Sequence, residues 1–507
     1  MNRLNSFFGL QIGLRALQTN QAAIDVTGNN IANASTTGYS REVVDLTETD
    51  PYTPPAFDAP VMAGQMGTGV QVAQIQRMRD TFTDSMYREQ TGRQNFYTAQ
   101  NDVLSKIQAV VNEPSSTGLS NALQSFFTAW QQVSQDPSAS NRAVLAQDTG
   151  ALTDMLHSMS SDLTQLNTYI NQTVSANVDS VNSLTSQIAA LNGQIQAVEA
   201  NKANTGQNAN TLRDQRDVLI DQLSQYGAIT VNEAPATGMD TITMGNMTTP
   251  LVSGTTANAL TAATDANGNK VVDDSSGTQV DLGYVSGSGS STDDNSGLVQ
   301  GYIAARDGAT SGSNGSDLTA QINNLNILAQ QLATSVNAQQ TQGYDTSGNP
   351  GVNFFTSGTS PTVDASNIEL NPLIAANTDL IAAASSTPAA AGDGGNALKI
   401  ANLQSAFPAG TTFVTGFPST QTFSGFWQTS VFNLGLAGQT ANSQETSYQA
   451  MVSQLDNQRQ QTSGVSNDQE MTNLLQYQHG YEAAARVINT EDSMLDTIVT
   501  GLGVITA

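Results

Sequence analysis

Apolar residues recur every seven positions at both ends of this 507-residue chain, and this spacing restricts its fold more than any other feature. A seven-residue repeat places side chains along one side of an α-helix, where they can pack against a second helix. The spacing therefore predicts one long helix within the first 33 residues and another within the last 40. The residues of this predicted terminal seam are Leu10, Leu14, Leu17, Ile24 and Ile31 near the start and Leu474, Tyr477, Tyr481, Ile488, Leu495 and Ile498 near the end.

Two interpretations of the terminal helices fit the periodicity. In the first, they form an ordinary helical hairpin that closes one domain. In the second, neighbouring copies cover the apolar sides during assembly, because one chain alone covers them poorly. The second interpretation predicts that the helices are largely disordered in the free monomer and become ordered on assembly, since isolated helices are only marginally stable in water.

The longest apolar repeat lies inside the chain and predicts a helix of some 36 residues, from Leu163 to Val198. An Asn- and Gly-rich turn at 201–210 separates it from a second predicted helix, Thr211–Tyr226, so the two are expected to form an antiparallel hairpin. Further helices are expected at 95–112, 119–134 and 317–342.

The remaining ordered sequence has β-type patterns. Alternating apolar and polar residues near 228–232 and 241–244, and the Asn267-Gly268 turn signal, predict a small β domain over about 228–306. Prolines indicate an extended segment at 51–80: Pro51, Pro54, Pro55 and Pro60. The expected fold is a multidomain α+β protein, a long helical coiled-coil body with paired terminal helices and an inserted β domain. The expected domains are 1–50 with 460–507, 51–227 with 307–459, and the outward-facing insert 228–306.

Composition excludes several classes of protein. The chain has no cysteine and two histidines, His157 and His479, which leaves no thiolate or His-rich metal site. The formal net charge of -26 makes nucleic acid and membrane surfaces poor partners. The charge is uneven, because residues 217–458 carry 3 basic and 19 acidic residues. We expect no catalytic residue, no metal and no cofactor.

Two short motifs resemble the start of calcium-binding loops, Asp265–Asn269 and Asp345–Asn349. An EF-hand also needs a glutamate at its twelfth position, and Ser276 and Thr356 stand there. We therefore interpret both motifs as turns. Two further candidates are the acidic pairs Asp273-Asp274 and Asp293-Asp294. Because adjacent residues point apart, these carboxylates do not converge on a substrate as paired catalytic carboxylates must. We interpret them as solvated side chains.

The stretch from Asn29 to Arg41 resembles the N-terminal signature of bacterial flagellar rod, hook and hook-associated proteins. The chain's end, Gly464 to Val499, resembles their C-terminal helix. The signature residues are Asn29, Asn30, Ile31, Asn33, Gly38 and Tyr39. Because both patterns occur in one chain at opposite ends, the resemblance is specific.

Interior motifs narrow the resemblance to the hook-associated protein 1 family, the first junction proteins between hook and filament. They lie at Leu212–Leu219, Ser296–Gly301 with Arg306-Asp307, Gly343–Asp345 with Phe354-Phe355, and Asn396–Leu403. The resemblance implies a structural protein that assembles as a short helical ring. Its implied partners are hook protein, the second hook–filament junction protein and copies of itself.

The family resemblance also implies a location and a route. No apolar segment long enough for a signal peptide is visible, which alone would favour the cytoplasm. Flagellar axial proteins are exported without a cleaved signal peptide and end outside the cell. A cytoplasmic export chaperone is expected to bind the C-terminal helix, with Leu474, Leu475, Tyr481, Ile488 and Leu495 as candidate contacts. Alternatives are a hook or other axial subunit, or an extracellular adhesin that uses the β insert.

Overall fold

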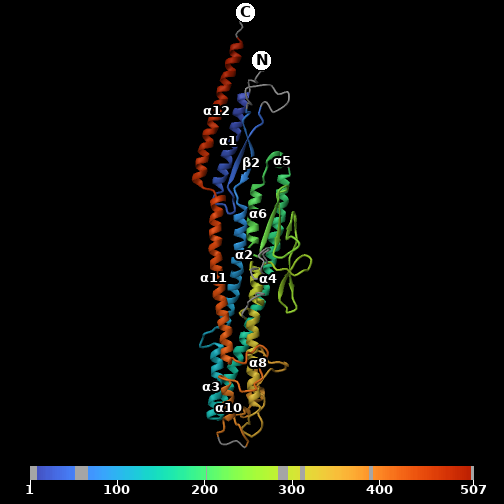
Figure 1. Cartoon of the computed structure of the whole chain (residues 1–507), viewed down its shortest axis with the longest axis vertical. Helices are drawn as coiled ribbons and strands as arrows, with labels where there is room; N and C mark the ends of the chain where they lie inside the picture. Colours follow the sequence, from blue (N-terminus) through green and yellow to red (C-terminus); the bar gives the residue numbers. More distant parts are fainter. Residues whose placement is uncertain are drawn as a thin grey trace.

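The computed structural model describes residues 8–51, 67–200, 202–283, 295–308, 315–387 and 392–503. They form a long, narrow rod of helices, and both ends of the described chain lie at the same end of the rod (Figure 1). Helices dominate and the strands form small antiparallel sheets, so the predicted α+β fold class is confirmed. Within the described residues, no helix is long and apolar enough to cross a membrane.

The central helix α4 spans Ala139–Glu199, 61 residues or about 92 Å at 1.5 Å per residue. The prediction of a helix starting at Leu163 was wrong, because buried Leu145, Leu152 and Leu156 continue the apolar repeat toward the N-terminus. The Ser138 side chain accepts a hydrogen bond from the Asn141 N–H and so caps the true start. After the short helix α5 (Lys202–Thr205), α6 (Asn210–Leu223) packs back along α4, which confirms the predicted hairpin.

Four other helices complete the body of the rod: α2 (Thr81–Val111), α3 (Leu119–Gln135), α8 (Leu318–Gln340) and α11 (Phe423–Ser463). Helices α2 and α11 lie side by side along most of their length (Figure 1). The shorter α7 (Leu298–Asp307) packs on α2, and α10 (Gly395–Asn402) packs on α3.

The end of the rod far from the termini is held by aromatic side chains. Trp130 and Phe354 are fully buried with ring centroids 5.0 Å apart, and Phe126 and Phe355 pack against them. Phe355 lies in the two-residue strand β9 (Phe355–Thr356), which pairs with β10 (Glu369–Leu370). The short helices α9 (Pro372–Ala376) and η1 (Thr378–Leu380) follow.

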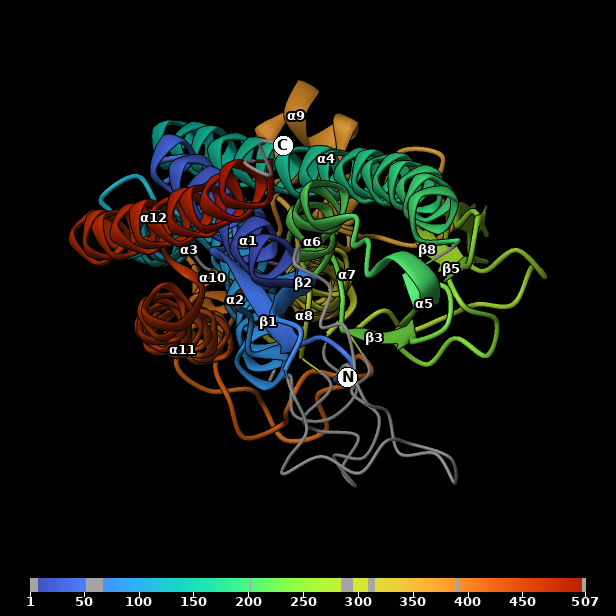
Figure 2. The same ribbon diagram turned by 90° about the horizontal axis from the view of Figure 1, so that it is seen from above.

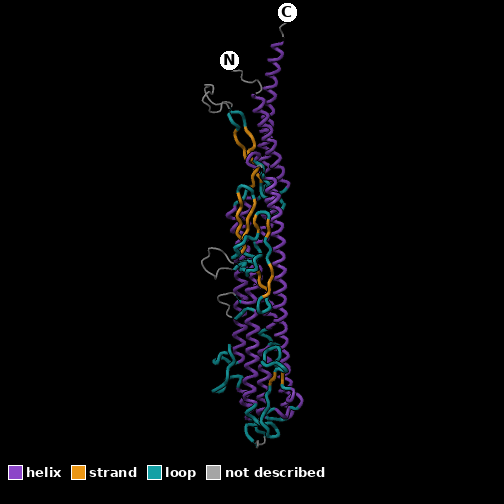
Figure 3. The backbone as a smooth tube through the Cα atoms, turned by 90° about the vertical axis from the view of Figure 1, so that its right-hand side faces the viewer, coloured by secondary structure: helices purple, strands orange, loops and turns teal. Residues whose placement is uncertain are grey.

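The strands lie along one side of the helices (Figure 3). One antiparallel sheet has the order β3–β4–β5–β6, and a separate hairpin joins β7 to β8. These strands are β3 (Ile229–Ala234), β4 (Met239–Met244), β5 (Val252–Ser253), β6 (Thr256–Ala257), β7 (Thr261–Thr264) and β8 (Lys270–Asp273). The Asn267-Gly268 turn is confirmed, with Gly268 at φ +82°. The last residues of the range 228–306 form α7 rather than a strand.

At the end with the termini, α1 (Phe8–Ala32) lies beside α12 (Asn467–Gly503), and α12 continues beyond α11 after Gly464 (Figures 1 and 2). A two-stranded hairpin of β1 (Glu42–Glu48) and β2 (Val70–Arg77) covers another side of α1. Arg15 fastens this hairpin by donating to the Thr68 carbonyl oxygen at 2.8 Å. The predicted extended segment is confirmed at β2, whereas Pro54, Pro55 and Pro60 lie outside the described residues.

Candidate assembly site

The two terminal helices pair in antiparallel fashion with a constant register. A Cβ placed on Gly13 would lie 2.8 Å from the Ile488 side chain, and one on Gly480 would lie 2.5 Å from that of Asn20. For two residues that face each other across the pair, the residue numbers therefore sum to about 500. Because glycine lacks a side chain, the helices approach closely at these points. The predicted pairing of the terminal helices is thus observed within one chain.

The pair buries only part of the predicted terminal seam. Most seam residues are half-buried: Leu10, Leu17, Ile24, Ile31, Leu474, Tyr477, Tyr481, Ile488 and Leu495. Leu14 and Ile498 remain 48% and 51% exposed. In α12 only Glu470 and Ala484 are fully buried among the residues whose side chains are described.

A second set of apolar side chains on α12 points to water. These are Met471, Leu475, Val487, Met494, Ile498 and Val499, each at least 46% exposed. The heptad pattern found only Ile498 of this set, because the others lie off the seam, and Leu475 was expected only as a chaperone contact. Large apolar side chains left exposed along the length of one helix are typical of a contact surface for another protein.

The family signature holds the base of the helix pair through Asn30, which is 1% exposed. The Asn30 side-chain amide donates to the Glu42 carbonyl oxygen at 2.9 Å and to the Glu470 carboxylate at 3.0 Å. Its oxygen accepts from the Glu42 N–H at 3.0 Å and from the Tyr39 hydroxyl at 2.8 Å. We call Asn30, Tyr39, Glu42 and Glu470 the junction cluster. It joins α1, the signature loop, β1 and α12.

The Tyr39 hydroxyl remains a donor in this cluster. Burial and then the carboxylates of Glu42, Asp214 and Glu470 raise the pKa of Tyr39 well above its ordinary value. Asn29 and Asn33 lie at the exposed side of the loop, where the Asn33 side chain donates to the Asn29 carbonyl oxygen at 3.0 Å. Ile31 is half-buried. The structure therefore brings the predicted signature residues together.

Gly38 lets the signature loop pass close to α6. It has φ +80°, and a Cβ there would overlap Val218 Cγ2. A larger residue would be strained and would also clash. Next to it, the Ser40 N–H and hydroxyl donate to Asp214 at 3.0 and 2.7 Å.

Below the junction cluster, six charged side chains form a closed ring of ion pairs. Asp217 contacts Arg79 and Arg88 at 3.2 and 3.5 Å. Arg79 contacts Asp84 at 2.8 Å, and Arg88 contacts Asp221 at 2.6 Å. Arg459 of α11 closes this arginine ring by reaching Asp84 at 2.9 Å and Asp221 at 2.7 Å. The ring joins α2, α6 and α11.

The arginines around Asp217 lower the pKa of its carboxyl group. Burial alone would raise the pKa of Asp217, but Arg79, Arg77 and Arg88 outweigh it and lower the pKa to about 2. Arg77 also binds Asp214 at 2.7 Å, which links the ring to the signature loop. The three carboxylates of α6 lie on one face of that helix, since they are three, four and seven residues apart. Asp214 and Asp217 belong to the Leu212–Leu219 motif and Asp221 follows it, but the cationic partners of these acids were not predicted from the sequence.

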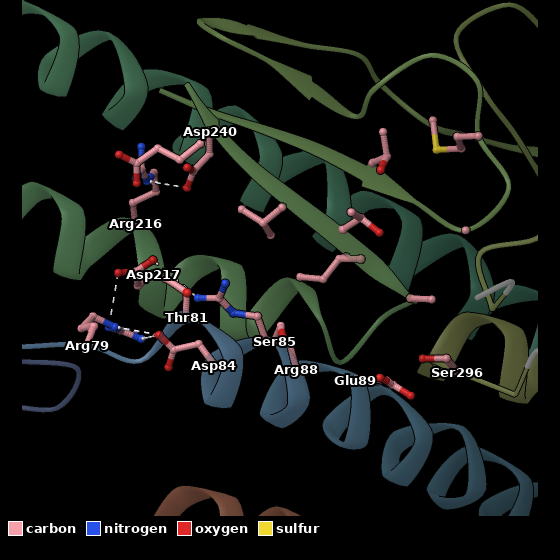
Figure 4. A pocket seen from close by; sticks show the side chains of 18 of the residues that line it. Arg79, Thr81, Asp84, Ser85, Arg88, Glu89, Arg216, Asp217, Asp240 and Ser296 are labelled. Atoms are coloured by element: carbon pink, nitrogen blue, oxygen red, sulfur yellow. Dashed lines mark hydrogen bonds and ion pairs between the residues drawn. The ribbon is translucent and has the colours of Figure 1, made fainter. Parts of the chain in front are cut away.

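A cavity of about 1070 Å³ lies between α2, α6 and the free edge of β3 (Figure 4). In its wall Arg216, which is 1% exposed, pairs with Asp240 at 2.8 Å. Burial raises the pKa of Asp240 to about 6 despite this partner. Nearby, burial would raise the pKa of Glu199, but hydrogen bonds from Arg213 and the Ala209 N–H outweigh it and lower the pKa to about 2. The charged side chains around the cavity are therefore mostly bound to each other in ion pairs.

No group of three or more potential metal ligands occurs among the described residues. The turn prediction is confirmed, because the Asp265 carboxylate accepts from the Asn267 and Asn269 N–H groups. Asp345 accepts in the same way from Ser347 and Asn349. The interpretation of Asp274 as a solvated side chain was wrong, because it is 4% exposed and its carboxylate accepts from the Ser276 and Thr278 N–H groups of its own turn. The pair at 293–294 lies outside the described residues.

The two histidines lie far apart in the structure and in different settings. His157 Nε2 lies 2.8 Å from the Ile368 carbonyl oxygen, which fits a local structural hydrogen bond. The His479 side chain is 80% exposed, and its nearest acidic neighbour is Glu482 at 3.9 Å. In the part of the chain that the structure describes, neither histidine lies beside a serine and carboxylate arranged for catalysis.

Comparisons with known proteins agree with the residues of this site. The family described as "Flagellar hook-associated protein FlgK helical domain" matches residues 104–355. A basal body rod family matches residues 10–39, which include most of the signature, and the basal body rod FlgEFG C-terminal family matches 456–501.

Full-length relatives extend the match. Flagellar hook-associated protein 1 of Bacillus subtilis is 32% identical over 99% of both chains. The protein of the same name from Salmonella typhimurium is 26% identical over 96% of this chain and 98% of its own. The fold is similar to that of the flagellar hook junction protein FlgK from Burkholderia pseudomallei, with a TM-score of 0.57 at 17% identity over 75% of this chain and all of that one. The chain belongs to the flagellar hook-associated protein 1 family.

Proposed function

We propose that the chain is a structural subunit of the bacterial flagellum that assembles with copies of itself between hook and filament. The partially covered terminal helix pair supports this proposal most directly. A monomer that keeps apolar side chains such as Met494 and Val499 in water gains free energy when a neighbour covers them, about 25 cal/mol per Å² of apolar surface buried.

We propose that three parts of the chain occupy different positions in the assembly. Residues 1–50 with 460–507 form the inner tube of the assembly, and 51–227 with 307–459 form the surrounding body. The insert 228–306 faces outward. The junction cluster and the arginine ring lie where the first two parts meet, so they would keep the inner helices at a fixed position relative to the body.

The proposed partners are hook protein and the second hook–filament junction protein. Before assembly, an export chaperone would cover the C-terminal helix at Leu474, Leu475, Tyr481, Ile488 and Leu495, and the chain would leave the cell without a cleaved signal peptide. The exposed side chain of Leu475 and the half-buried ones of the other four make this surface accessible to such a partner. We propose no enzymatic activity.

A strain that lacks this protein tests the proposal. We expect hooks without filaments, with filament protein shed into the medium, and restoration by the full-length chain. Complete filaments in the deletion strain would contradict the proposed role.

Substitutions in the helix pair refine the test. Leu495→Asp or Leu474→Asp should abolish filament attachment or chaperone binding, because each places a charge in the terminal seam. Cooperative unfolding of the purified variants should match wild type, since the seam lies outside the body. Wild-type motility of both variants would show that the seam is not needed for assembly.

A further inference from the structure

The outward face of α11 carries no charge over its whole length. This 41-residue helix contains three charged residues, and none of the three is fully exposed. Glu445 accepts hydrogen bonds from Thr98 and Asn101 of α2, and Arg459 belongs to the arginine ring. Asp456 is half-buried and accepts from Gln460 at 2.7 Å. The exposed residues are Gln, Asn, Ser, Thr and small or apolar side chains, and we call this surface the amide face.

An uncharged face of this size is unusual in a chain with a net charge of -26. The outer side of α4 shows the contrast, because Asp154, Asp162 and Asp179 are exposed there. No lysine or arginine occurs between Arg142 and Lys202 to neutralise these acids. Copies of a strongly acidic chain repel each other unless they meet through a surface without like charges.

The shape of the amide face also suits a packed partner. Small residues such as Ser443, Ser447 and Ala450 follow each other at spacings of three and four residues, so they lie on one side of α11 and permit close approach. The large apolar side chains Phe432 and Met451 are 68% and 43% exposed on the same helix.

The face is large enough for a specific interface. Forty-one residues at 1.5 Å per residue give a length of about 62 Å. With a helix width of about 10 Å, this face offers roughly 600 Å², close to the ~800 Å² per partner of a standard interface. The face is also continuous with α12 through Gly464, and so with the surface already proposed for assembly.

We propose that the amide face of α11 docks a second copy of this chain, on the outer side of that copy's α4. Helices α11 and α4 both pack on α2 and lie on different sides of it (Figures 1 and 2). A ring of identical subunits needs two different contact surfaces on each copy. Side-chain amides of Gln and Asn can donate to the α4 carboxylates, whereas two α4 surfaces would repel. This inference rests on the proposed assembly function.

A charge-insertion experiment tests the amide face. Gln454→Glu with Gln461→Glu adds two negative charges to exposed positions of α11 at nearly constant shape. The matched control, Gln207→Glu with Gln279→Glu, adds the same charge at exposed positions away from both helices. We expect about tenfold fewer filaments per cell for the first pair and wild-type numbers for the control. Both proteins should unfold at the wild-type temperature when purified, so that a folding defect is separated from a docking defect.

Cysteine labelling tests the contact directly, because the chain has no cysteine of its own. Ser447→Cys on α11 and Ser161→Cys on α4 should react with a maleimide in the purified chain and be protected in isolated flagella. Ser276→Cys in the insert should react in both states. Full maleimide reactivity of the Ser447→Cys variant in flagella, with normal filaments in the charged variant, would overturn the inference. Protection of the Ser447→Cys variant with full reactivity of the Ser161→Cys variant would overturn the assignment to α4.

These outcomes are separable from failure of the proposed function. If the deletion strain lacks filaments while the charged variant restores them, the result supports the proposed junction role and contradicts docking through the amide face. If the deletion strain has complete filaments, the junction role itself fails.

Discussion

The side-chain amide of Asn30 donates a 3.0 Å hydrogen bond to the carboxylate of Glu470, although 440 residues separate the two. Both side chains are buried, at 1% and 3% exposure. The bond holds the end of α1 against the start of α12, at the point where the helix pair meets the body of the rod.

Replacing Asn30 should loosen the helix pair. Asn30→Ala removes the bonds to Glu42, Tyr39 and Glu470 and leaves a buried carboxylate with one partner fewer. We expect a loss of about 2–3 kcal/mol in local stability, measured as faster amide hydrogen exchange in α1 and α12. Asn489→Ala, at an exposed position of α12, is the matched control and should exchange like wild type. Equal exchange in the Asn30 and Asn489 variants would contradict a role for the junction cluster.

Gly38→Ala should displace the signature loop from α6. The substitution places a Cβ against Val218 and forces an L-residue to φ +80°, which costs about 1–3 kcal/mol for the backbone alone. Urea unfolding should show this loss. Adding Val218→Ala should recover only part of it, because the backbone strain remains. Gly28→Ala, where a Cβ meets nothing within 4 Å, should be neutral or stabilising.

Opening the arginine ring should destabilise the rod strongly. Arg459→Leu leaves the buried carboxylate of Asp84 and the partly buried one of Asp221 without one of their cations, and the loss should approach the about 3–5 kcal/mol that removing one member of a fully buried ion pair costs. Arg459→Lys should recover part of the loss, since an ammonium group cannot reach both carboxylates with the same geometry. Thermal unfolding of both variants measures the difference. Identical melting of the leucine and lysine variants would show that charge pairing at this position does not matter.

The raised pKa of Asp240 predicts a specific pH dependence. Its folded pKa of about 6 lies above the ordinary 3.8, so the folded state binds this proton more tightly than the unfolded state. The stability that this proton provides is fully present below about pH 4 and is lost as pH rises to 6, by about 3 kcal/mol at most. Asp240→Asn should remove this loss, so its unfolding free energy should fall less between pH 4 and 6 than that of wild type. Equal slopes would contradict the assignment.

The helices and their apolar sides could be predicted from the sequence because periodicity reports which side of a helix is buried. Periodicity does not report the partner, so Leu14 and Ile498 fitted the repeat yet remain about half exposed. Helix lengths were underestimated, as in α4, where buried Leu145, Leu152 and Leu156 extend the apolar repeat before Leu163. The β insert was recognised by its turn signals, since Asn-Gly sequences favour the conformation that Gly268 adopts.

The contacts between distant segments could not be predicted. Asn30 and Tyr39 were identified through a resemblance, but nothing local shows that they meet Glu470. The acids of α6 are visible in the sequence, but their pairing with Arg79, Arg88 and Arg459 depends on the packing of three helices. Residues matched through space by shape and charge leave no periodic pattern in a single sequence.

Because residue numbers facing each other in the terminal pair sum to about 500, the first helix of the chain meets its partner only when the last 40 residues are present. A ribosome that stops early, or a protease that removes the tail, therefore yields a chain whose first helix keeps only the β1–β2 hairpin beside it. The pairing makes completeness of the polypeptide a physical condition for forming the surface that we propose for assembly.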